Sequence, residues 1–204
     1  MPGSGRGRFL VLEGIDGSGK SSTLRHAVQV LRDQGRDVVA TREETETELG
    51  GWVRKSVADR VEPLATAFLF MADRAQHVRE IEAWLRQGRT VLCDRYVHST
   101  LAYQSVTLQG VVPDPVGFLT RMHEGWCPMP DKVLLFRADP ARSVERTQAR
   151  GARTPYEKTR FLQQVQDNYL RMAAGDPRFT VLDAERPIDV VKAEATERLL
   201  RWTS

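Results

Sequence analysis

Short runs of consecutive apolar residues alternate along this chain with longer stretches in which apolar residues recur every three or four positions. The short runs predict buried strands, which are residues 9–12, 38–41, 90–93, 133–136 and 179–182. The periodic stretches predict helices, which are residues 21–34, 64–86, 115–124, 141–150, 157–173 and 188–202. Because strands that alternate with helices form parallel sheets, we expect an α/β fold with a five-stranded parallel sheet and helices on both faces.

Length and composition narrow the class of protein. The chain has 204 residues, of which 41% are hydrophobic and 28% charged, as in a folded globular protein rather than a disordered one. This length fits a single domain over residues 1–204. No apolar run approaches the ~20 residues needed to cross a bilayer, and the N-terminus does not resemble a secretory signal, so we expect no membrane partner. With only two cysteines, Cys93 and Cys127, we expect a reducing, cytoplasmic setting.

The clearest chemical signal is the segment Gly14-Ile15-Asp16-Gly17-Ser18-Gly19-Lys20-Ser21, which lies between the first predicted strand and the first predicted helix. It matches the pattern G-x-x-x-x-G-K-[S/T] of loops that bind the phosphates of a nucleoside triphosphate. In such a loop backbone N–H groups face the phosphates, the lysine reaches the β and γ phosphates, and the serine ligates Mg²⁺. The residues expected to contact the triphosphate are Gly14, Asp16, Gly17, Ser18, Gly19, Lys20, Ser21 and Ser22. The alternative, a glycine-rich turn that binds nothing, does not explain why a strand and a helix flank the pattern.

Other classes of nucleotide-binding protein fit less well. Ras-like GTPases read guanine with the motif N-K-x-D, but the only asparagine, Asn168, precedes Tyr169. The net charge is +3, and all but five of the 30 basic residues are arginines. This suits either small phosphorylated ligands or a generally arginine-rich surface. No run of five basic residues and no zinc-finger or RRM pattern occurs, so we expect no nucleic-acid partner.

Charged and aromatic side chains follow the predicted strands or share one helix face. Arg42 and Arg95 each come directly after a strand, where they either bind an acceptor phosphate or form surface ion pairs. Asp94 ends the third strand, where it either ligates Mg²⁺, directly or through water, or pairs with an arginine. Phe70 and Arg74 lie four positions apart on one helix, so the ring could stack on a base while the guanidinium donates to it. Phe70 equally suits core packing.

Four segments, in this order, resemble the thymidylate kinase family. They are the strand and loop FLVLEGIDGSGKSS, then Thr41-Arg42-Glu43, then residues 68–74, and then residues 94–104. The resemblance extends over residues 8–200. It implies a P-loop, nucleoside-monophosphate-kinase fold with a short lid, and transfer of the γ-phosphoryl group of ATP to dTMP to give dTDP. It also implies Mg²⁺ as the cofactor and a homodimer.

The resemblance assigns roles to residues on the acceptor side. It implies that Arg42 and Arg95 bind the phosphate of dTMP. It implies that Phe70 stacks on the thymine ring and that Arg74 donates a hydrogen bond to O4 of the base.

Four further residues are implied to contact dTMP. Ser99 and Gln104 approach the edge of the base, and Tyr103 packs against the sugar, where it disfavours a 2′-hydroxyl. Asp16, inside the P-loop, resembles the acidic residue of the family that accepts a hydrogen bond from the 3′-hydroxyl of the acceptor.

A lid is expected over about residues 146–157, between two predicted helices. In this family the catalytic arginine lies in the P-loop or in the lid. Because Gly17 occupies the loop position, the resemblance implies that Arg150 and Arg153, near Arg146, supply it. An arginine that closes over ATP excludes water and stabilises the charge on the transferring group. The alternative is that these arginines only cover a helix end. The expected catalytic residues are Lys20, Arg95, Arg150 and Arg153.

Three segments depart from the usual pattern of the family. Glu44-Thr45-Glu46-Thr47 replaces Pro-Gly-Gly-Thr and adds carboxylates near the acceptor phosphate. Thr154-Pro155-Tyr156 stands where the lid usually carries Asp-Arg, and Arg137-Ala138 stands where the fourth strand usually ends in an Asp-containing stretch. These departures leave two alternatives open, which are a kinase for another pyrimidine monophosphate and a non-catalytic nucleotide-binding relative.

Overall fold

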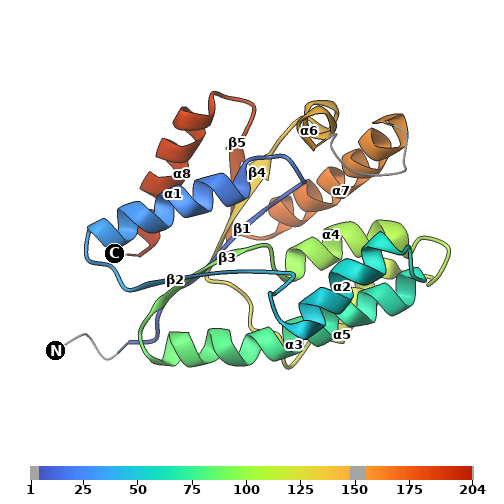
Figure 1. Cartoon of the computed structure of the whole chain (residues 1–204), viewed down its shortest axis with the longest axis horizontal. Helices are drawn as coiled ribbons and strands as arrows, with labels where there is room; N and C mark the ends of the chain where they lie inside the picture. The colour runs from blue at the N-terminus through green and yellow to red at the C-terminus, as the bar shows by residue number, and fades with distance from the viewer. Residues whose placement is uncertain (1–4, 148–154, 204) are drawn as a thin grey trace.

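The computed structural model describes residues 5–147 and 155–203 and contains the predicted five-stranded parallel sheet (Figure 1). Its strands are β1 (Phe9–Gly14), β2 (Val38–Arg42), β3 (Thr90–Asp94), β4 (Lys132–Arg137) and β5 (Phe179–Asp183). The order across the sheet is β2-β3-β1-β4-β5, and every neighbouring pair is parallel. All five predicted strands are confirmed, each with one or two residues added at its ends.

Helices connect the strands, and two of them were not predicted. The helices are α1 (Lys20–Asp33), α2 (Glu48–Ala58), α3 (Pro63–Arg86), α4 (Val97–Thr107), α5 (Pro115–His123), α6 (Pro140–Thr147), α7 (Pro155–Gly175) and α8 (Ile188–Trp202). The unpredicted helices are α2, which contains two adjacent glycines, and α4, which buries polar side chains such as Thr100 and Gln104. Helix α4 lacks the apolar stripe from which a helix is predicted, whereas α2 spaces Leu49, Trp52 and Val53 as a helix does but contains two glycines, which disfavour one. No helix within the described residues is long and apolar enough to cross a membrane.

The two faces of the sheet are covered by different helices, as the alternation of side chains along β1 shows. Leu10 and Leu12 belong to the buried cluster that contains the apolar side chains of α1. Phe9 and Val11 belong to a second cluster, which contains side chains of α3. Because successive side chains of a strand point to opposite faces, α1 and α3 cover opposite sides of the sheet. The prediction of helices on both faces is confirmed.

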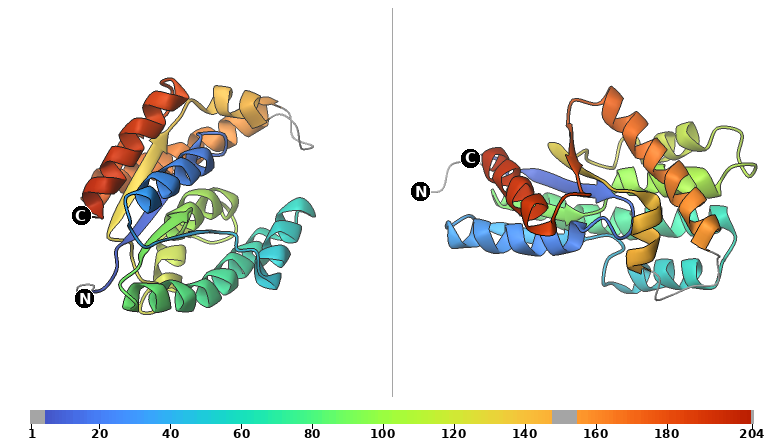
Figure 2. Two further views of the ribbon diagram at one scale, coloured as in Figure 1. Left: turned by 60° about the vertical axis from the view of Figure 1, so that its left-hand side comes forward. Right: turned by 90° about the horizontal axis from the view of Figure 1, so that it is seen from above.

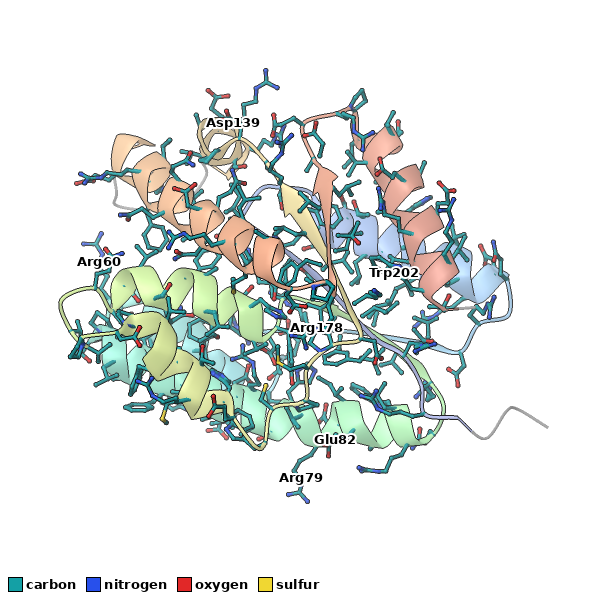
Figure 3. All side chains as sticks on the ribbon, turned by 180° about the vertical axis from the view of Figure 1, so that it is seen from behind. Arg60, Arg79, Glu82, Asp139, Arg178 and Trp202 are labelled. Carbon is teal, nitrogen blue, oxygen red and sulfur yellow. The ribbon has the colours of Figure 1, made fainter. Side chains whose placement is uncertain are left out.

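Six of the eight helices in the described residues form two groups around the sheet. In Figures 1 and 2, α1 and α8 lie side by side, whereas α2, α3, α4 and α5 gather at the other end of the molecule. The long helix α3 presents one face to the sheet through Val78, Ile81 and Leu85. Figure 3 shows Arg79 and Glu82, on the opposite face of the same helix, pointing away from the molecule.

The carboxyl ends of the central strands bring the predicted site residues together. Gly14, Arg42 and Asp94 end β1, β2 and β3. Arg42 is the register partner of Asp94, and Leu12 of β1 pairs with Asp94 from the other side. All five strands run in the same direction, so the loops that follow them open at one edge of the sheet, where ligands of open α/β sheets bind.

Candidate active site

The loop between β1 and α1 has the backbone of a phosphate-binding loop. Gly14, Gly17 and Gly19 have φ angles of +140°, +78° and +89°, which residues with a Cβ rarely adopt. At Gly14 an added Cβ would also lie 2.5 Å from the carbonyl oxygen of Phe136. These glycines let the chain turn from the centre of the sheet into α1. The N-terminus of α1, which carries partial positive charge, therefore lies at the loop.

Lys20 lies inside this loop. Its Nζ donates hydrogen bonds to the carbonyl oxygens of Gly14 and Ile15, both at 2.8 Å, and to Oγ of Ser18 at 3.2 Å. The side chain is buried, and burial together with the positive charge of Arg95 lowers its pKa to about 7. An anionic phosphate placed in the loop would compensate this desolvation, so the loop is built to accept negative charge.

Ser21 and Asp94 form the part of the site that fits a magnesium ion. The Ser21 hydroxyl donates to Oδ2 of Asp94, which ends the neighbouring strand β3. The other carboxylate oxygen, Oδ1, is buried and has no hydrogen-bond partner in the part of the chain that the structure describes. A hydroxyl and a carboxylate are hard oxygen ligands of the kind that Mg²⁺ prefers. The two predicted metal ligands therefore lie in contact.

Arg95 joins the phosphate-binding loop to the loop after β3. Its NH2 donates to Oδ1 of Asp16 at 2.7 Å, and its guanidinium lies 5.1 Å from the centre of the Tyr103 ring. The Tyr103 hydroxyl accepts a hydrogen bond from the backbone N–H of Asp16 at 3.0 Å. The positive charge of Arg95 holds the pKa of Asp16 below its usual value, so this carboxylate is ionised at neutral pH. Asp16, Arg95 and Tyr103, all predicted to contact the acceptor, therefore lie in contact with one another.

Arg42 lies at the same edge of the sheet but is more exposed. Its NH1 lies 3.6 Å from the carboxylate of Glu46, and this carboxylate lies 3.7 Å from NH2 of Arg54. Glu46 belongs to the segment that departs from the family pattern. Its negative charge therefore lies beside one of the two arginines expected to bind the acceptor phosphate.

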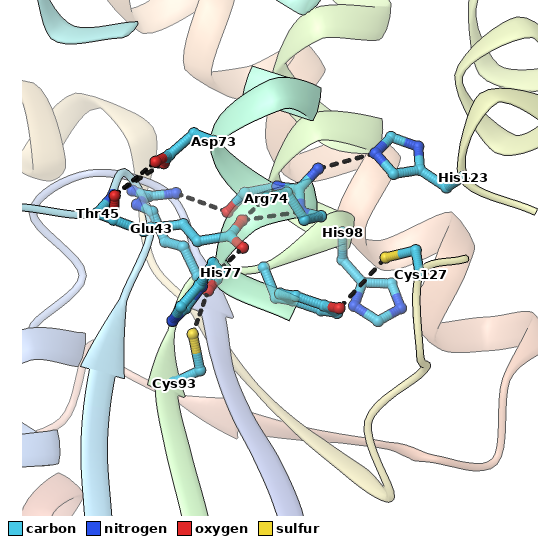
Figure 4. Close-up of polar contacts among 12 residues, drawn as sticks. Glu43, Thr45, Asp73, Arg74, His77, Cys93, His98, His123 and Cys127 are labelled. Atoms are coloured by element: carbon cyan, nitrogen blue, oxygen red, sulfur yellow. Dashed lines mark hydrogen bonds and ion pairs between the residues drawn. The ribbon is translucent and has the colours of Figure 1, made fainter. Parts of the chain in front are cut away.

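Arg74 is held in a buried network that sequence analysis did not find (Figure 4). Its Nε donates to Oε2 of Glu43 at 2.9 Å, and its NH1 lies 2.9 Å from Nε2 of His123. His77 contacts the other oxygen of Glu43 at 3.1 Å. Burial and the positive charge of Arg74 lower the pKa of His123 to about 4, so its ring is neutral and can accept from Arg74. In the sequence Glu43 stands out only as part of the motif Thr41-Arg42-Glu43, because nothing there shows which arginine it contacts.

Two polar side chains of α4 are buried. Thr100 has a buried hydroxyl without a hydrogen-bond partner among residues 5–147 and 155–203. Gln104, a predicted base-contact residue, is buried one turn further along the same helix. A buried hydroxyl without a partner is costly unless a ligand satisfies it. Phe70 lies on α3, one turn before Arg74, and is half-buried.

Ser99, the other predicted base-contact residue, is engaged by protein groups. Its Oγ donates to Oε2 of Glu13 at 2.7 Å and lies 2.8 Å from the hydroxyl of Tyr169. Its Oγ also accepts a hydrogen bond from NH1 of Arg95 at 3.1 Å. The predicted role of Ser99 at the base edge stays a prediction, whereas its contact with Arg95 is a feature of the structure.

A cleft of about 540 Å³ opens beside the phosphate-binding loop. It is lined by Gly17, Ser18, Gly19, Arg146, Ala184, Glu185, Arg186, Pro187 and Ile188. Glu185 holds two arginines of α6 there, since its carboxylate lies 3.1 Å from Arg142 and 3.7 Å from Arg146. Arg146 also donates to the carbonyl oxygen of Gly17 at 3.4 Å. The sequence suggested Arg146 but not the segment after β5. The lid arginines Arg150 and Arg153 lie outside the described residues.

Comparison with known proteins agrees with this arrangement. A family model described as thymidylate kinase matches residues 12–195. The chain belongs to the thymidylate kinase family. A protein named "Probable thymidylate kinase" from Methanosarcina mazei is 40% identical, with 97% of each chain aligned. Proteins of the same name from Methanoculleus marisnigri and Natronomonas pharaonis are 44% and 38% identical, over 90% and 93% of this chain and 89% and 95% of theirs.

Membership of the family confirms several sequence-based predictions together. The resemblance, the fold class and the expectation of a nucleoside monophosphate kinase are all confirmed. The chain is therefore a nucleotide-binding phosphotransferase. The order of strands and the loop after β1 agree with this fold on independent geometric grounds.

Proposed function

We propose that this member of the thymidylate kinase family transfers the γ-phosphoryl group of ATP to dTMP and forms dTDP and ADP. The observation that carries the proposal is the contact of Arg95 with Asp16 at 2.7 Å, which places an arginine suited to the acceptor phosphate against the loop that binds the donor. The printed names of the relatives, all probable thymidylate kinases, support dTMP as the acceptor.

On the donor side the phosphate-binding loop and α1 hold the triphosphate. Backbone N–H groups and Lys20 bind the β and γ phosphates, and the cleft beside Arg146 has room for the nucleoside. Ser21 and Asp94 would hold Mg²⁺, which would supply positive charge to offset the charge of the phosphates.

On the acceptor side Arg95 and Arg42 would bind the phosphate of dTMP and offset its repulsion from ATP. A phosphate oxygen of dTMP then forms a bond to the γ-phosphorus while the bond to the β–γ bridging oxygen breaks, which requires positioning and charge neutralisation rather than a covalent enzyme intermediate. Arg74 would donate to O4 of thymine, and Phe70 would stack on the ring. Asp16, ionised by its contact with Arg95, suits a hydrogen bond from the 3′-hydroxyl.

Other parts of the proposal concern the lid, the assembly and the cellular setting. We assign closure over the transferring group to Arg150 and Arg153 in a lid over about residues 146–157, within a single domain. We propose a homodimer and a cytoplasmic setting, the latter consistent with the free thiols of Cys93 and Cys127.

The test is an acceptor panel of dTMP, dUMP, UMP, dCMP and AMP with ATP and Mg²⁺. We expect the highest kcat/KM for dTMP, and a loss of at least about 100-fold in kcat/KM for Lys20→Ala and for Arg95→Ala, because each removes charge stabilisation at the transferring group. A clear preference for another acceptor would instead identify a different pyrimidine kinase. Absence of turnover with every acceptor would identify a non-catalytic relative.

A further inference from the structure

Glu13 is a fully buried carboxylate at the carboxyl end of β1, immediately before the phosphate-binding loop. Its Oε1 accepts hydrogen bonds from the backbone N–H groups of Tyr96 and Ser99, at 2.9 and 3.1 Å. Its Oε2 accepts from the hydroxyls of Ser99 and Tyr169, at 2.7 and 2.9 Å. One carboxylate therefore ties the central strand to the start of α4 and to the middle of α7.

The two oxygens of Glu13 face donors that differ in one important way. The backbone N–H groups at Oε1 can only donate, so an acceptor must stand opposite them. The hydroxyl of Ser99 can donate or accept, and the carboxylate at Oε2 forces it to donate. The lone pairs of the Ser99 oxygen are thereby turned toward NH1 of Arg95, at 3.1 Å, and toward the hydroxyl of Tyr169, at 2.8 Å.

The backbone of Arg95 is held in place as well as its side chain. Arg95 has a φ angle of +70°, in the left-handed region that favours glycine, and such a conformation persists only where surrounding contacts hold it. Its N–H donates to the carbonyl oxygen of Leu12 at 2.9 Å. The guanidinium is then fixed from two sides, by Ser99 and by Asp16 at 2.7 Å.

We propose that Glu13 is a positioning residue that orients Arg95 toward the acceptor phosphate through the hydroxyl of Ser99. Glu13 itself touches neither substrate, because it is buried beneath Ser99. The inference rests on the proposed function, since it assumes that Arg95 binds the phosphate of a nucleoside monophosphate.

Glu13→Gln tests the proposal without changing the size of the side chain. The amide must keep its oxygen opposite the two backbone N–H groups, so its NH₂ group faces Ser99. The Ser99 hydroxyl then accepts from the amide instead of donating, so its oxygen has one lone pair fewer for Arg95, and its hydrogen turns toward Arg95 or the Tyr169 hydroxyl. Ser99→Ala removes the link in a second way. Tyr169→Phe is the control, because it removes a hydroxyl that contacts both Glu13 and Ser99 but leaves Ser99 between Glu13 and Arg95.

The experiment compares the binding of dTMP with that of thymidine, which has the same base and sugar but no phosphate. We expect Glu13→Gln and Ser99→Ala to raise the KM for dTMP about tenfold, as expected when a hydrogen bond that orients a charged group is lost. The inhibition constant of thymidine and the KM for ATP should stay within about twofold of wild type. Tyr169→Phe should leave the KM for dTMP within the same range, although all three variants are expected to lose some stability against urea.

Two results would overturn the inference. One is an unchanged KM for dTMP in folded Glu13→Gln. The other is an equal loss of thymidine and dTMP binding in Ser99→Ala, which would show that Ser99 contacts the base directly. If the wild-type protein did not phosphorylate dTMP, the proposed function itself would be rejected, an outcome distinct from either of these.

Discussion

Lys20 is a buried lysine whose lowered pKa makes the stability of the nucleotide-free protein depend on pH. In the folded protein burial lowers its pKa to about 7, whereas an unfolded chain holds it near the ordinary value of 10.5. Between these two values the unfolded chain keeps a proton that the folded chain has released. Raising the pH through this window therefore favours the folded state, at up to about 1.4 kcal/mol per pH unit.

The Lys20→Met variant isolates this contribution. We expect the free energy of unfolding of the wild type to rise between pH 7 and pH 9 relative to that of Lys20→Met, which has no proton to release at this position. Urea unfolding of both proteins without nucleotide measures the difference. Parallel pH profiles would show that Lys20 is fully charged in the empty loop.

His98 is a second buried titratable residue, but it has no place in the proposed reaction. Both ring nitrogens are buried and without a hydrogen-bond partner among the described residues, and the ring packs edge-on against Phe179 at 4.8 Å. Its Nδ1 lies 4.0 Å from Oε1 of Glu13. Burial, reinforced by the positive charge of Arg178, lowers the pKa of His98 to about 3.

Replacing His98 by an apolar ring should make the stability of the folded protein less sensitive to acid. As the pH falls below 6.5, the unfolded chain protonates His98 while the folded chain does not, so stability is lost by up to about 1.4 kcal/mol per pH unit. We expect His98→Phe to lose less stability than wild type between pH 7 and pH 5 in urea unfolding, with the edge-on packing retained. Equal losses would contradict a neutral, unpaired His98.

At the scale of elements, the segment between β2 and α2 replaces the glycine-rich turn of the family with a hydrogen-bonded one. The backbone N–H of Thr45 donates to Oδ2 of Asp73 on α3 at 2.9 Å, and its hydroxyl donates to Oδ1 at 2.5 Å. The side chain of Thr47 accepts from the N–H of Gly50 and caps α2. Hydrogen bonds of the two threonines thus order the turn. The changed segment alters the charge near Arg42, because Glu46 adds a carboxylate there.

Glu46→Gln should improve binding of the acceptor. The carboxylate lies 3.6 Å from Arg42 and repels the phosphate that Arg42 is expected to bind. Because both side chains are exposed, the effect is limited to about 0.2–1 kcal/mol, or roughly a 1.5- to 5-fold decrease in the KM for dTMP. Steady-state kinetics at low and high salt measure the KM for dTMP of both proteins, and the decrease in KM should be smaller at high salt. A raised KM would show that Glu46 instead holds Arg42 in its working position.

For the whole molecule, the group of helices from α2 to α5 carries exposed apolar side chains. They include Trp52 and Val57 of α2, Phe68 of α3, and Val116 and Met122 of α5. Phe68 is 44% exposed and lies 6.4 Å from the ring of Phe118, between centroids. Large exposed apolar side chains on neighbouring helices support the proposed homodimer at this end of the molecule.

Phe68→Glu should weaken such a dimer. We expect the wild type to sediment at twice the mass of the chain, and Phe68→Glu to sediment at the mass of one chain at micromolar concentration, because a buried unpaired charge is costly at an interface. Val190→Glu, an exposed position of α8 in the other group of helices, is the control and should leave the mass unchanged. A monomeric wild type would reject the homodimer.

Much of this molecule follows from local patterns in the sequence. Apolar runs such as residues 9–12 and helical periodicity predict the strands and most helices, because the spacing of side chains along the chain decides which of them share one face of an element. The glycines at positions 14, 17 and 19 and the residues at strand ends, Arg42 and Asp94, then meet at one edge, since parallel strands end together.

Only the tertiary structure decided how the polar groups are paired. Glu13 meets Ser99 across 86 residues of sequence, and Glu43 meets Arg74 across 31. The helices α2 and α4 also escaped prediction, the latter because its polar side chains are buried. A buried carboxylate or hydroxyl leaves no periodic mark in the sequence. Its partner is set by which surfaces pack together, and so by the whole fold at once.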